Sequence, residues 1–270
     1  MGRQSEAEWR RRLDGSDQGD RPLRRFWRAF PTAPRCKLCL RPFAGPGGAL
    51  MRMINLGPWD KNPRYCRGCY QDIDANHGGA EVELSMLFAD VRGSTGLAER
   101  MTPRDFSDLL NRFYEVAARV LVRREAIVDK FVGDEVVGLF VPGMSGLDHA
   151  SKAIDASLAL LEATGHGSTE GAWIPLGAGV HTGIAFVGSV GDRGVTDFTA
   201  LGDSVNTTAR LASAAGEGEV LVTRAAADAA GLVGELEHRR LDLRGRTEPI
   251  EVVVLRPDSA SRRSTADNAP

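Results

Sequence analysis

Two aspartates stand where a carboxylate is costly unless it binds a partner. Asp90 ends the largely apolar run VELSMLFAD, and Asp134 lies at the expected tip of a hairpin in KFVGDEV. An unpaired carboxylate beside buried strand residues is unfavourable. If the two strand ends are adjacent, these carboxylates can hold a hard cation such as Mg²⁺ together with substrate phosphates. Each has an ordinary alternative, Asp90 as a helix cap and Asp134 as a turn residue.

The turn after Asp90 has the composition of an anion-binding loop. It precedes an expected helix, so its backbone N–H groups can face a phosphate. An aspartate at a strand end beside such a loop suits phosphoryl chemistry, in which metal ions hold the nucleotide and neutralise developing charge. The residues of this turn are Arg92, Gly93, Ser94 and Thr95.

A third polar segment, DFTALGDSVNTTARLAS, favours the same chemistry. Asn206 and Arg210 are four residues apart and therefore share one face of a helix. Arg210 offers a guanidinium fork suited to phosphate, and Asn206 offers an amide. Lys130 is a donor within the mostly apolar stretch that leads to Asp134, although an exposed strand lysine is its ordinary alternative.

All four cysteines lie near the front of the chain, in two pairs of the form Cys-x2-Cys separated by 26 residues. In a reducing compartment such pairs indicate metal ligands rather than disulfides. Four thiolates suit tetrahedral Zn²⁺, whose binding can supply the folding energy that so short a segment lacks. An iron–sulfur cluster and a redox-switching dithiol are the alternatives. The predicted zinc ligands are Cys36, Cys39, Cys66 and Cys69.

The elements that must position these groups follow from residue periodicity. Thr102 and Pro103 open a helix as N-cap and first-turn residue. Two apolar runs flank Gly133-Asp134-Glu135 and predict a hairpin. Other helices are expected between Gly146 and Gly165 and over 203–216. A strand is expected from about Val82 to Asp90, and two strands joined by a short turn within 174–191. Further strands are expected over 219–223, 237–243 and 250–255. An antiparallel-rich sheet with helices on one face fits an α+β, ferredoxin-like architecture.

The charge changes sign along the chain. Residues 1–69 carry 15 Lys+Arg and 6 Asp+Glu, whereas residues 70–270 carry 19 and 30. A basic front and an acidic body predict units with different roles. We expect a basic arm over 1–35, a zinc module over 36–75, a linker over 76–81, a catalytic domain over 82–257 and a disordered polar tail over 258–270.

The expected location is the cytoplasm. The opening residues MGRQSEAEWRRRLDG have no apolar stretch of the kind that a secretion signal contains. No apolar run approaches the ~20 residues that span a bilayer. The basic groups Arg10–Arg12 and Arg24–Arg25 can meet nucleic acid, an anionic membrane surface or the acidic body of the protein itself. A solvated arm beside a structural module is the simplest interpretation.

Four segments together resemble the catalytic domain of the class III adenylyl and guanylyl cyclases. They are FADVRGST, KFVGDEVVGLF, GVHTGIAFVGSVG and TALGDSVNTTARLA, and they occur in the family's order and spacing. The resemblance covers about Glu81 to Pro257. VGDEV also resembles the GGDEF signature of diguanylate cyclases, but the Gly-Gly pair is missing and the last segment is that of class III enzymes.

The resemblance implies roles for the polar residues. Asp90 and Asp134 would bind two Mg²⁺ or Mn²⁺ ions, one of which also takes the backbone carbonyl of Val91. The ribose 3′-hydroxyl would attack the α-phosphate and pyrophosphate would leave. Arg210 would stabilise charge in the transition state, and Asn206 would orient the ribose.

The resemblance also implies how the base is chosen. Lys130 and Thr199 occupy the base-selecting pair, where guanylyl cyclases typically use Glu and Cys. Lysine can donate to the adenine N1 acceptor, whereas guanine carries a donor there, so the pair favours ATP. Many relatives have Asp at the position of Thr199. A basic residue near the C-terminus contacts the triphosphate in relatives, and Arg246 is preferred over Arg244 for that role.

Family members place their active sites at a dimer interface, with the metal aspartates from one subunit and the Lys, Thr, Asn and Arg set from the other. This chain has both sets, so the resemblance implies a homodimer with two sites. His181 is interpreted as a packed or hydrogen-bonded strand residue. Two alternatives stay open: a guanylyl or mixed-specificity cyclase, and a non-catalytic nucleotide-responsive regulator whose front contacts nucleic acid. A regulatory role for the zinc module, with or without a partner, is a further hypothesis.

Overall fold

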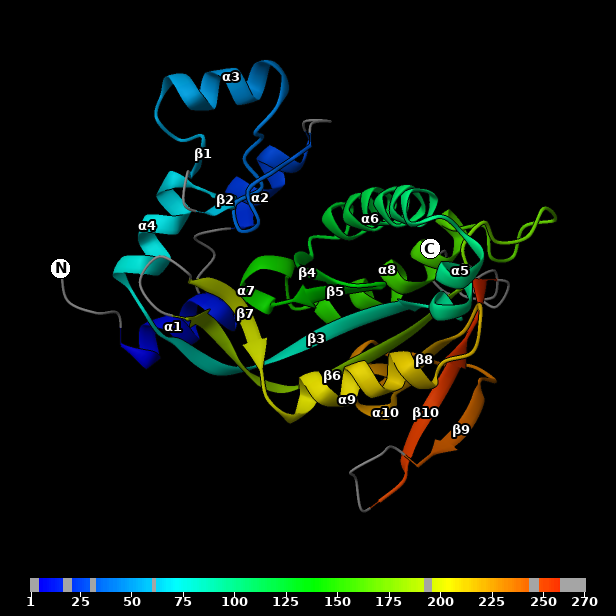
Figure 1. Cartoon of the computed structure of the whole chain (residues 1–270). Helices are drawn as coiled ribbons and strands as arrows, with labels where there is room; N and C mark the ends of the chain where they lie inside the picture. Colours follow the sequence, from blue (N-terminus) through cyan, green and yellow to red (C-terminus); the bar gives the residue numbers. More distant parts are fainter. Residues whose placement is uncertain are drawn as a thin grey trace, which may run out of the picture.

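A long central strand organises the chain (Figure 1). β3 (Gly79–Val91) pairs antiparallel with β6 (Leu176–Val190) along its whole length, and its second half pairs antiparallel with β5 (Glu135–Phe140). The structure is a computed structural model, and it describes residues 5–16, 21–29, 33–59, 62–191, 196–242 and 248–257. The predicted tail over 258–270 lies outside the described residues.

The main sheet is mostly antiparallel. Its strands lie in the order β4-β5-β3-β6-β8-β10-β9, and β7 pairs with β6 beside this path. Only the β6–β8 pair is parallel among the described strands. This arrangement confirms the α+β class. The remaining strands are β4 (Ile127–Val132), β7 (Asp197–Leu201), β8 (Val220–Thr223), β9 (Glu237–Leu241) and β10 (Ile250–Leu255).

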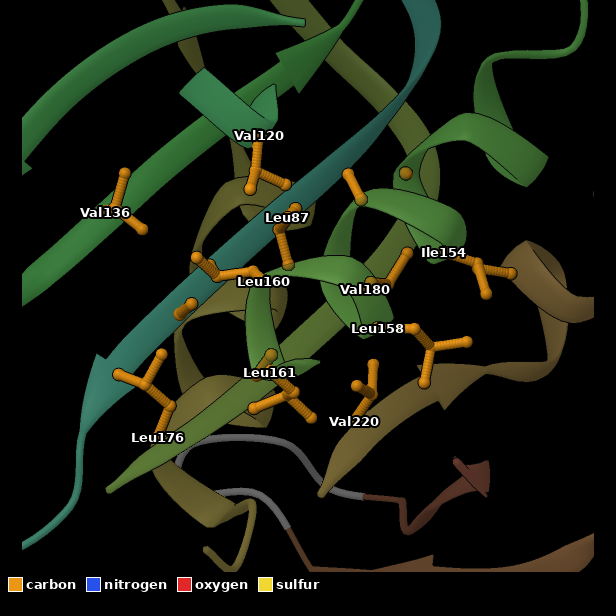
Figure 2. Close-up of a cluster of buried hydrophobic side chains, with 14 of the residues drawn as sticks. Leu87, Val120, Val136, Ile154, Leu158, Leu160, Leu161, Leu176, Val180 and Val220 are labelled. Carbon is orange, nitrogen blue, oxygen red and sulfur yellow. The ribbon is translucent and has the colours of Figure 1, made fainter. Parts of the chain in front are cut away.

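Side-chain alternation along β3 builds two cores on opposite faces of the sheet. Leu87 and Ala89 face one core, which Figure 2 shows, together with apolar residues of α6 (Pro103–Arg123), α8 (His149–Ala163) and α10 (Arg224–Ala229). Met86 and Phe88 face the other core, which residues of the front segment fill. α9 (Asp203–Ala214) also lies on this second face, where Leu211 packs against Leu221, Val252 and Val254. The expectation of helices on one face is therefore wrong, because α9 has its own apolar contacts with β8 and β10.

β6 is one continuous strand, although its glycines predicted two strands and a turn. These glycines mark close backbone approach instead. A Cβ on Gly179 would lie 2.5 Å from the backbone nitrogen of Ala212 in α9, and one on Gly188 would lie 2.5 Å from Cα of Gly79. Because Gly79 pairs with Gly188, β3 begins at Gly79 rather than at Val82, the predicted start of this strand.

The predicted helices are present with the expected caps. The side chain of Thr102 accepts a hydrogen bond from the N–H of Asp105 at the start of α6. Helix α8 lies between the predicted glycines, and α9 ends shortly before Gly216. The short helices α5 (Ser94–Arg100) and α7 (Pro142–Ser145) complete the domain. Among the described residues, no helix combines the length and the apolar composition that crossing a bilayer requires.

The front segment is helical and packed onto the sheet rather than solvated. Trp9 and Leu13 of α1 are buried in the second core. Arg24 of α2 is 2% exposed and donates to the carbonyls of Leu38, Glu125 and Ala126. The simplest interpretation, a solvated arm, is therefore wrong for the described residues. The front elements are α1 (Glu6–Leu13), α2 (Arg21–Arg28), α3 (Gly45–Met53), β1 (Pro58–Trp59), β2 (Asn62–Cys66) and α4 (Arg67–Ala75).

The basic residues of this segment contact acidic partners in the same chain, which was one of the open alternatives. Arg12 pairs with Asp72 of α4 at 2.7 Å. Arg25 and Arg28 both pair with Glu125, which follows α6, at 3.2 and 3.1 Å. The positive charge of the front thus serves partly to attach it to the acidic body.

Acid should weaken the sheet at Glu219. Hydrogen bonds from Arg239 lower the pKa of Glu219 to about 2, although burial acts in the opposite direction. Hydrogen bonds from the N–H of Gly216 and from Arg256 also lower it. A lowered folded-state pKa gives stability above the unfolded-state pKa of 4.5 that is lost as the pH falls toward 2. We expect Glu219→Gln to remove about 1–3 kcal/mol at pH 7 and to flatten the acid limb of the stability curve. Urea unfolding between pH 7 and 3 measures this.

The matched control is Glu251→Gln, because Glu251 is exposed and its contact with Arg224 is 3.5 Å long. This variant should follow the wild-type curve. If Glu219→Gln follows that curve too, the Glu219 cluster contributes nothing to acid sensitivity.

Candidate active site

The two predicted metal aspartates meet at one end of the sheet. Asp90 lies at the end of β3 opposite Glu135, the first residue of β5. Asp134 occupies the tight turn between β4 and β5, and its carbonyl accepts a hydrogen bond from the N–H of Val91 at 3.2 Å. Gly133 has φ +60°, a left-handed conformation that favours glycine in this turn. The pairing of β3 with β5 thus brings Asp90, Val91 and Asp134 together.

This end of the sheet concentrates negative charge. Burial raises the pKa of Asp90 to about 6; the positive charge of Arg92 opposes this shift and the charge of Asp134 adds to it. Burial also raises the pKa of Glu135 to about 7, and the charges of Asp90 and Asp134 add to that shift. Glu135 was not among the predicted site residues, because its position opposite Asp90 depends on strand register. A cation is the partner that such carboxylates favour.

The turn after Asp90 leads directly into a short helix. Gly93 is left-handed, with φ +66°, and α5 begins at Ser94 without a side-chain cap. Asp90 therefore does not cap this helix, which was its ordinary alternative. Arg92 instead forms an ion pair with Asp90 and donates to the carbonyls of Ser213 and Ala215 at 2.9 and 3.3 Å. The N–H groups of Ser94 and Thr95 stand at the start of the helix, close to Asp90 in sequence.

The predicted base-selecting residues meet at a buried aspartate. Thr199 of β7 donates from its hydroxyl to Oδ2 of Asp129 at 2.9 Å. The Nζ of Lys130 lies 3.3 Å from the same oxygen. The Asp129 side chain is 2% exposed, whereas that of Lys130 is 43% exposed and reaches the surface. Asp129 was not among the predicted site residues, although an acidic residue in the apolar run AIVDKFV is a signal for one.

The four-cysteine module contacts these strands directly. Lys37, which follows Cys36, donates from Nζ to Oδ1 of Asp129 at 2.8 Å, to Oδ1 of Asp197 at 2.9 Å and to the carbonyl of Phe198 at 2.6 Å. Its side chain is 3% exposed. Tyr65, which precedes Cys66, donates to the Asp197 carboxylate and accepts from the N–H of Phe198 at 2.9 Å. The module therefore packs on β4 and β7 through polar contacts as well as apolar ones.

Asn206 and Arg210 project from α9, on the sheet face that carries the module. Asn206 is exposed and Arg210 is half-buried. Neither side chain makes a hydrogen bond or ion pair with another residue in the part of the chain that the structure describes. In particular, no such contact joins them to Asp90 or Asp134. One chain thus presents two separate sets of polar residues.

Two further predictions have different outcomes. His181 is a hydrogen-bonded strand residue as expected, because its Nδ1 lies 3.0 Å from Oγ1 of Thr223. Arg244 and Arg246, the candidates for a triphosphate contact, lie outside the described residues.

The four cysteines form a compact cluster. Their Sγ atoms all lie within 4.8 Å of one another, and those of Cys39 and Cys66 are 3.6 Å apart. In a tetrahedral Zn²⁺ site with Zn–S bonds of about 2.3 Å, sulfur atoms lie about 3.8 Å apart. The observed spacing therefore fits one metal ion. Cys36, Cys39 and Cys66 are buried, and Cys69 is half-buried.

Two of the sulfur atoms accept hydrogen bonds of the kind that stabilise metal-bound thiolates. The backbone N–H of Cys66 donates to Sγ of Cys36 at 3.2 Å, and Arg41 donates to Sγ of Cys66 at 3.4 Å. Hydrogen bonds from the other three thiols, Cys36 first, lower the pKa of Cys66, whereas contacts within the cluster, again Cys36 first, raise the pKa of Cys39 and Cys69. The donor set and its polar surroundings thus fit a structural metal.

Comparison with known proteins identifies the domain. Residues 80–254 match the adenylate and guanylate cyclase catalytic domain family. An uncharacterized protein of Mycobacterium tuberculosis (strain ATCC 25618 / H37Rv) is 30% identical over 180 residues, which are 65% of this chain and 33% of that protein. Adenylate cyclase 1 of Rhizobium meliloti (strain 1021) is 28% identical over 149 residues, which are 52% of this chain and 22% of that enzyme. The chain spans about a third or less of these relatives' length.

Solved structures agree with this assignment. The guanylyl cyclase Cya2 matches with a TM-score of 0.59 and 25% identity, covering 66% of this chain and 93% of that one. The adenylyl cyclase CyaB from P. aeruginosa matches with a TM-score of 0.57 and 26% identity, covering 65% and 94%. Both matches and the family match cover more than half of the chain. The chain therefore belongs to the class III adenylyl and guanylyl cyclase family, whose catalytic domain it contains.

Proposed function

We propose that the protein is an adenylyl cyclase that converts ATP to cyclic AMP and pyrophosphate as a homodimer. The observation that carries the proposal is the meeting of Asp90, Val91 and Asp134 at the β3–β5 end of the sheet. Two carboxylates and a backbone carbonyl form an oxygen ligand set for Mg²⁺ or Mn²⁺. Adenylyl and guanylyl cyclases among the similar proteins support the same chemistry.

The proposed reaction is an internal displacement. The ribose 3′-oxygen forms a bond to the α-phosphorus, the bond from that phosphorus to the bridging oxygen breaks, and pyrophosphate leaves. Metal ions held by Asp90, Asp134 and the Val91 carbonyl would supply activation of the 3′-hydroxyl and neutralise phosphate charge. Arg210 would stabilise charge on the α-phosphate, and Asn206 would orient the ribose. The N–H groups at Gly93, Ser94 and Thr95 would face the phosphates.

The base preference rests on Lys130 and Thr199. The ammonium of Lys130 reaches the surface and can donate to the N1 acceptor of adenine, whereas guanine has an N–H group there. Thr199 lies beside Lys130 because both contact Asp129. Donor and acceptor mismatches of this kind discriminate strongly between substrates. A guanylyl or mixed-specificity cyclase is the second candidate, since Cya2 is a guanylyl cyclase.

A homodimer is proposed because one chain carries two separate half-sites. Asn206 and Arg210 have no partner in the described part of their own chain and are available to a second copy. Large apolar side chains are exposed on β4, β6 and β7, where burial in a dimer would be favourable. They are Phe131, Val132, Ile184 and Leu201.

The four-cysteine cluster is proposed to bind structural Zn²⁺, and the module to regulate the catalytic domain through its contacts with β4 and β7. A cytoplasmic setting fits both proposals, because the substrate is ATP and the free thiols need a reducing compartment. The non-catalytic alternative is less favoured, since Asp90, Asp134, Asn206 and Arg210 are all present.

The test is cyclic nucleotide formation by the purified protein with ATP or GTP and with Mg²⁺ or Mn²⁺. Wild-type protein should form cyclic AMP with a higher kcat/KM than cyclic GMP, and Asp90→Ala should lose at least about 10³-fold in rate. Asp203→Ala, a change to an exposed acid outside the proposed metal set, is the control and should retain activity. Preference for GTP would replace the adenylyl assignment by the second candidate. No product from a folded dimer would reject catalysis.

A further inference from the structure

We propose that Asp129 is a positioning residue that sets the hydrogen-bond polarity of the purine pocket through Thr199 and Lys130. The proposal rests on the adenylyl cyclase function above, in which these two side chains meet the base. Asp129 itself is buried at the junction of β4, β7 and the four-cysteine module.

Two lysine side chains contact the Asp129 carboxylate. The ammonium of Lys37 lies 2.8 Å from Oδ1, and the ammonium of Lys130 lies 3.3 Å from Oδ2. Both oxygens of the carboxylate therefore have a lysine donor. An ionised carboxylate only accepts hydrogen bonds.

This fixes the direction of the hydrogen bond to Thr199. The hydroxyl has one hydrogen, and the 2.9 Å contact with Oδ2 of Asp129 requires that hydrogen. The free lone pairs of the Thr199 oxygen can then only accept. Adenine presents an N–H donor at its 6-position, and guanine presents a carbonyl oxygen. Thr199 oriented in this way therefore suits adenine and leaves guanine without a donor.

Lys130 is oriented by the same carboxylate. Its Nζ lies 3.3 Å from Oδ2 of Asp129 and its side chain is 43% exposed, so the remaining N–H groups can donate to a base. The adenine N1 lone pair accepts such a bond, whereas the guanine N1–H does not. Asp129 thus holds the Thr199 oxygen as an acceptor beside the Lys130 ammonium as a donor. The 6-amino group and N1 of adenine complement this pair.

The four-cysteine module holds Asp129 in place. Lys37 directly follows Cys36 in the chain, so the cysteine cluster holds its backbone. Its Nζ donates hydrogen bonds to Asp129, Asp197 and the carbonyl of Phe198. Arg64, also in the module, donates to the backbone carbonyl of Asp129. These contacts position both ends of the residue.

Asp197 offers a matched control. It shares the Lys37 ammonium with Asp129 and contacts Arg64 and Tyr65 of the module. No hydrogen bond or ion pair to Thr199 or Lys130 is found for it among the described residues. Neutralising Asp197 should disturb the module contact without changing the polarity of the base pocket.

The experiment compares Asp129→Asn and Asp197→Asn in the full-length protein. The readouts are the ratio of kcat/KM for ATP to that for GTP, and the ratio of the association constant of ribose-labelled fluorescent ATP to that of the GTP analogue. An asparagine amide can donate to the Thr199 oxygen, which frees the hydroxyl hydrogen for guanine. Asp129→Asn should lower both ratios at least about tenfold, while Asp197→Asn should leave them unchanged.

Two further variants make the result decisive. Thr199→Val should lower the ratios by itself, and adding it to Asp129→Asn should have little extra effect, because both changes act through one hydroxyl. If Asp129→Asn fails to fold, Lys37→Met with Asp129→Asn removes both buried charges together and carries the same expected ratio.

The outcomes separate this proposal from the function on which it rests. Unchanged ratios in folded Asp129→Asn, or an equal loss with both nucleotides, overturn the role of Asp129 alone. A wild-type protein that forms no cyclic nucleotide rejects the proposed activity, yet the binding ratios still test Asp129. Wild-type ratios that favour GTP overturn both.

Discussion

Mixing the inactive variants Asp134→Ala and Arg210→Ala is expected to restore cyclic AMP formation to about a quarter of the wild-type rate, as for sites shared across a two-fold axis. Random exchange of subunits makes half of the dimers mixed. In each mixed dimer one site combines both substitutions and the other has neither. Restored activity would therefore show that the two half-sites of one chain serve different active sites.

Each variant alone should lose at least about 10³-fold in kcat. Asp134→Ala removes half of the carboxylate set at the β3–β5 end, and Arg210→Ala removes the cation proposed to face the α-phosphate. Arg210 makes no hydrogen bond or ion pair with a described residue of its own chain, so its loss should leave stability nearly unchanged. Urea unfolding of the single variants checks that point.

The matched control mixes two variants of one half-site. Asp90→Ala with Asp134→Ala should remain inactive, because every dimer then lacks a complete metal site. Restoration in that mixture, or none with Asp134→Ala and Arg210→Ala despite subunit exchange seen by native mass spectrometry, would contradict shared sites.

Removing the zinc proposed for the four-cysteine module is expected to have the largest effect on stability. The double variant Cys36→Ser with Cys66→Ser should contain no zinc and should unfold with about 3–5 kcal/mol less free energy than wild type. The reason is that Lys37 and Tyr65 adjoin these cysteines and bond to Asp129 and Asp197. Metal analysis and urea unfolding measure the two effects.

The consequence for the active site follows from the same contacts. Release of Lys37 leaves Asp129 without its nearer cation, so the ratio of ATP to GTP turnover should fall as in Asp129→Asn. Cys69→His is the conservative control, since histidine is also a zinc ligand and Cys69 is the one half-buried member of the set. A zinc-free double variant with wild-type stability and wild-type nucleotide preference would reject both a structural and a regulatory role for the module.

The local chemistry of this protein could be predicted from sequence because each signal is short-range. Asn206 and Arg210 share a helix face through their spacing of four, and Gly133 with Asp134 forms a tight turn between two apolar runs. The cysteine spacing predicted a cluster that the structure contains. The conformation of such segments depends on backbone dihedral preferences and on residue periodicity, and a few neighbouring residues determine both.

Some elements were mispredicted because the same residue type has different structural roles in different surroundings. The glycines of β6 predicted a turn, but they permit close approach of α9 and of β3. The basic residues of the front suggested a solvated arm, yet Arg24 is buried against three carbonyls of distant segments. Neither outcome is visible until the packing partner is known.

Residue type and spacing were enough to predict the α+β class and the cysteine cluster, and they carry the proposed roles of the two aspartates and of the Lys130–Thr199 pair. The position of Glu135 opposite Asp90, and the buried chain of contacts formed by Lys37, Asp129 and Thr199, depend on the packing of distant segments. Lys37 and Asp197 are separated by 160 positions, and no local pattern pairs them. Burial removes water from such groups, so each charge must find its partner across the fold.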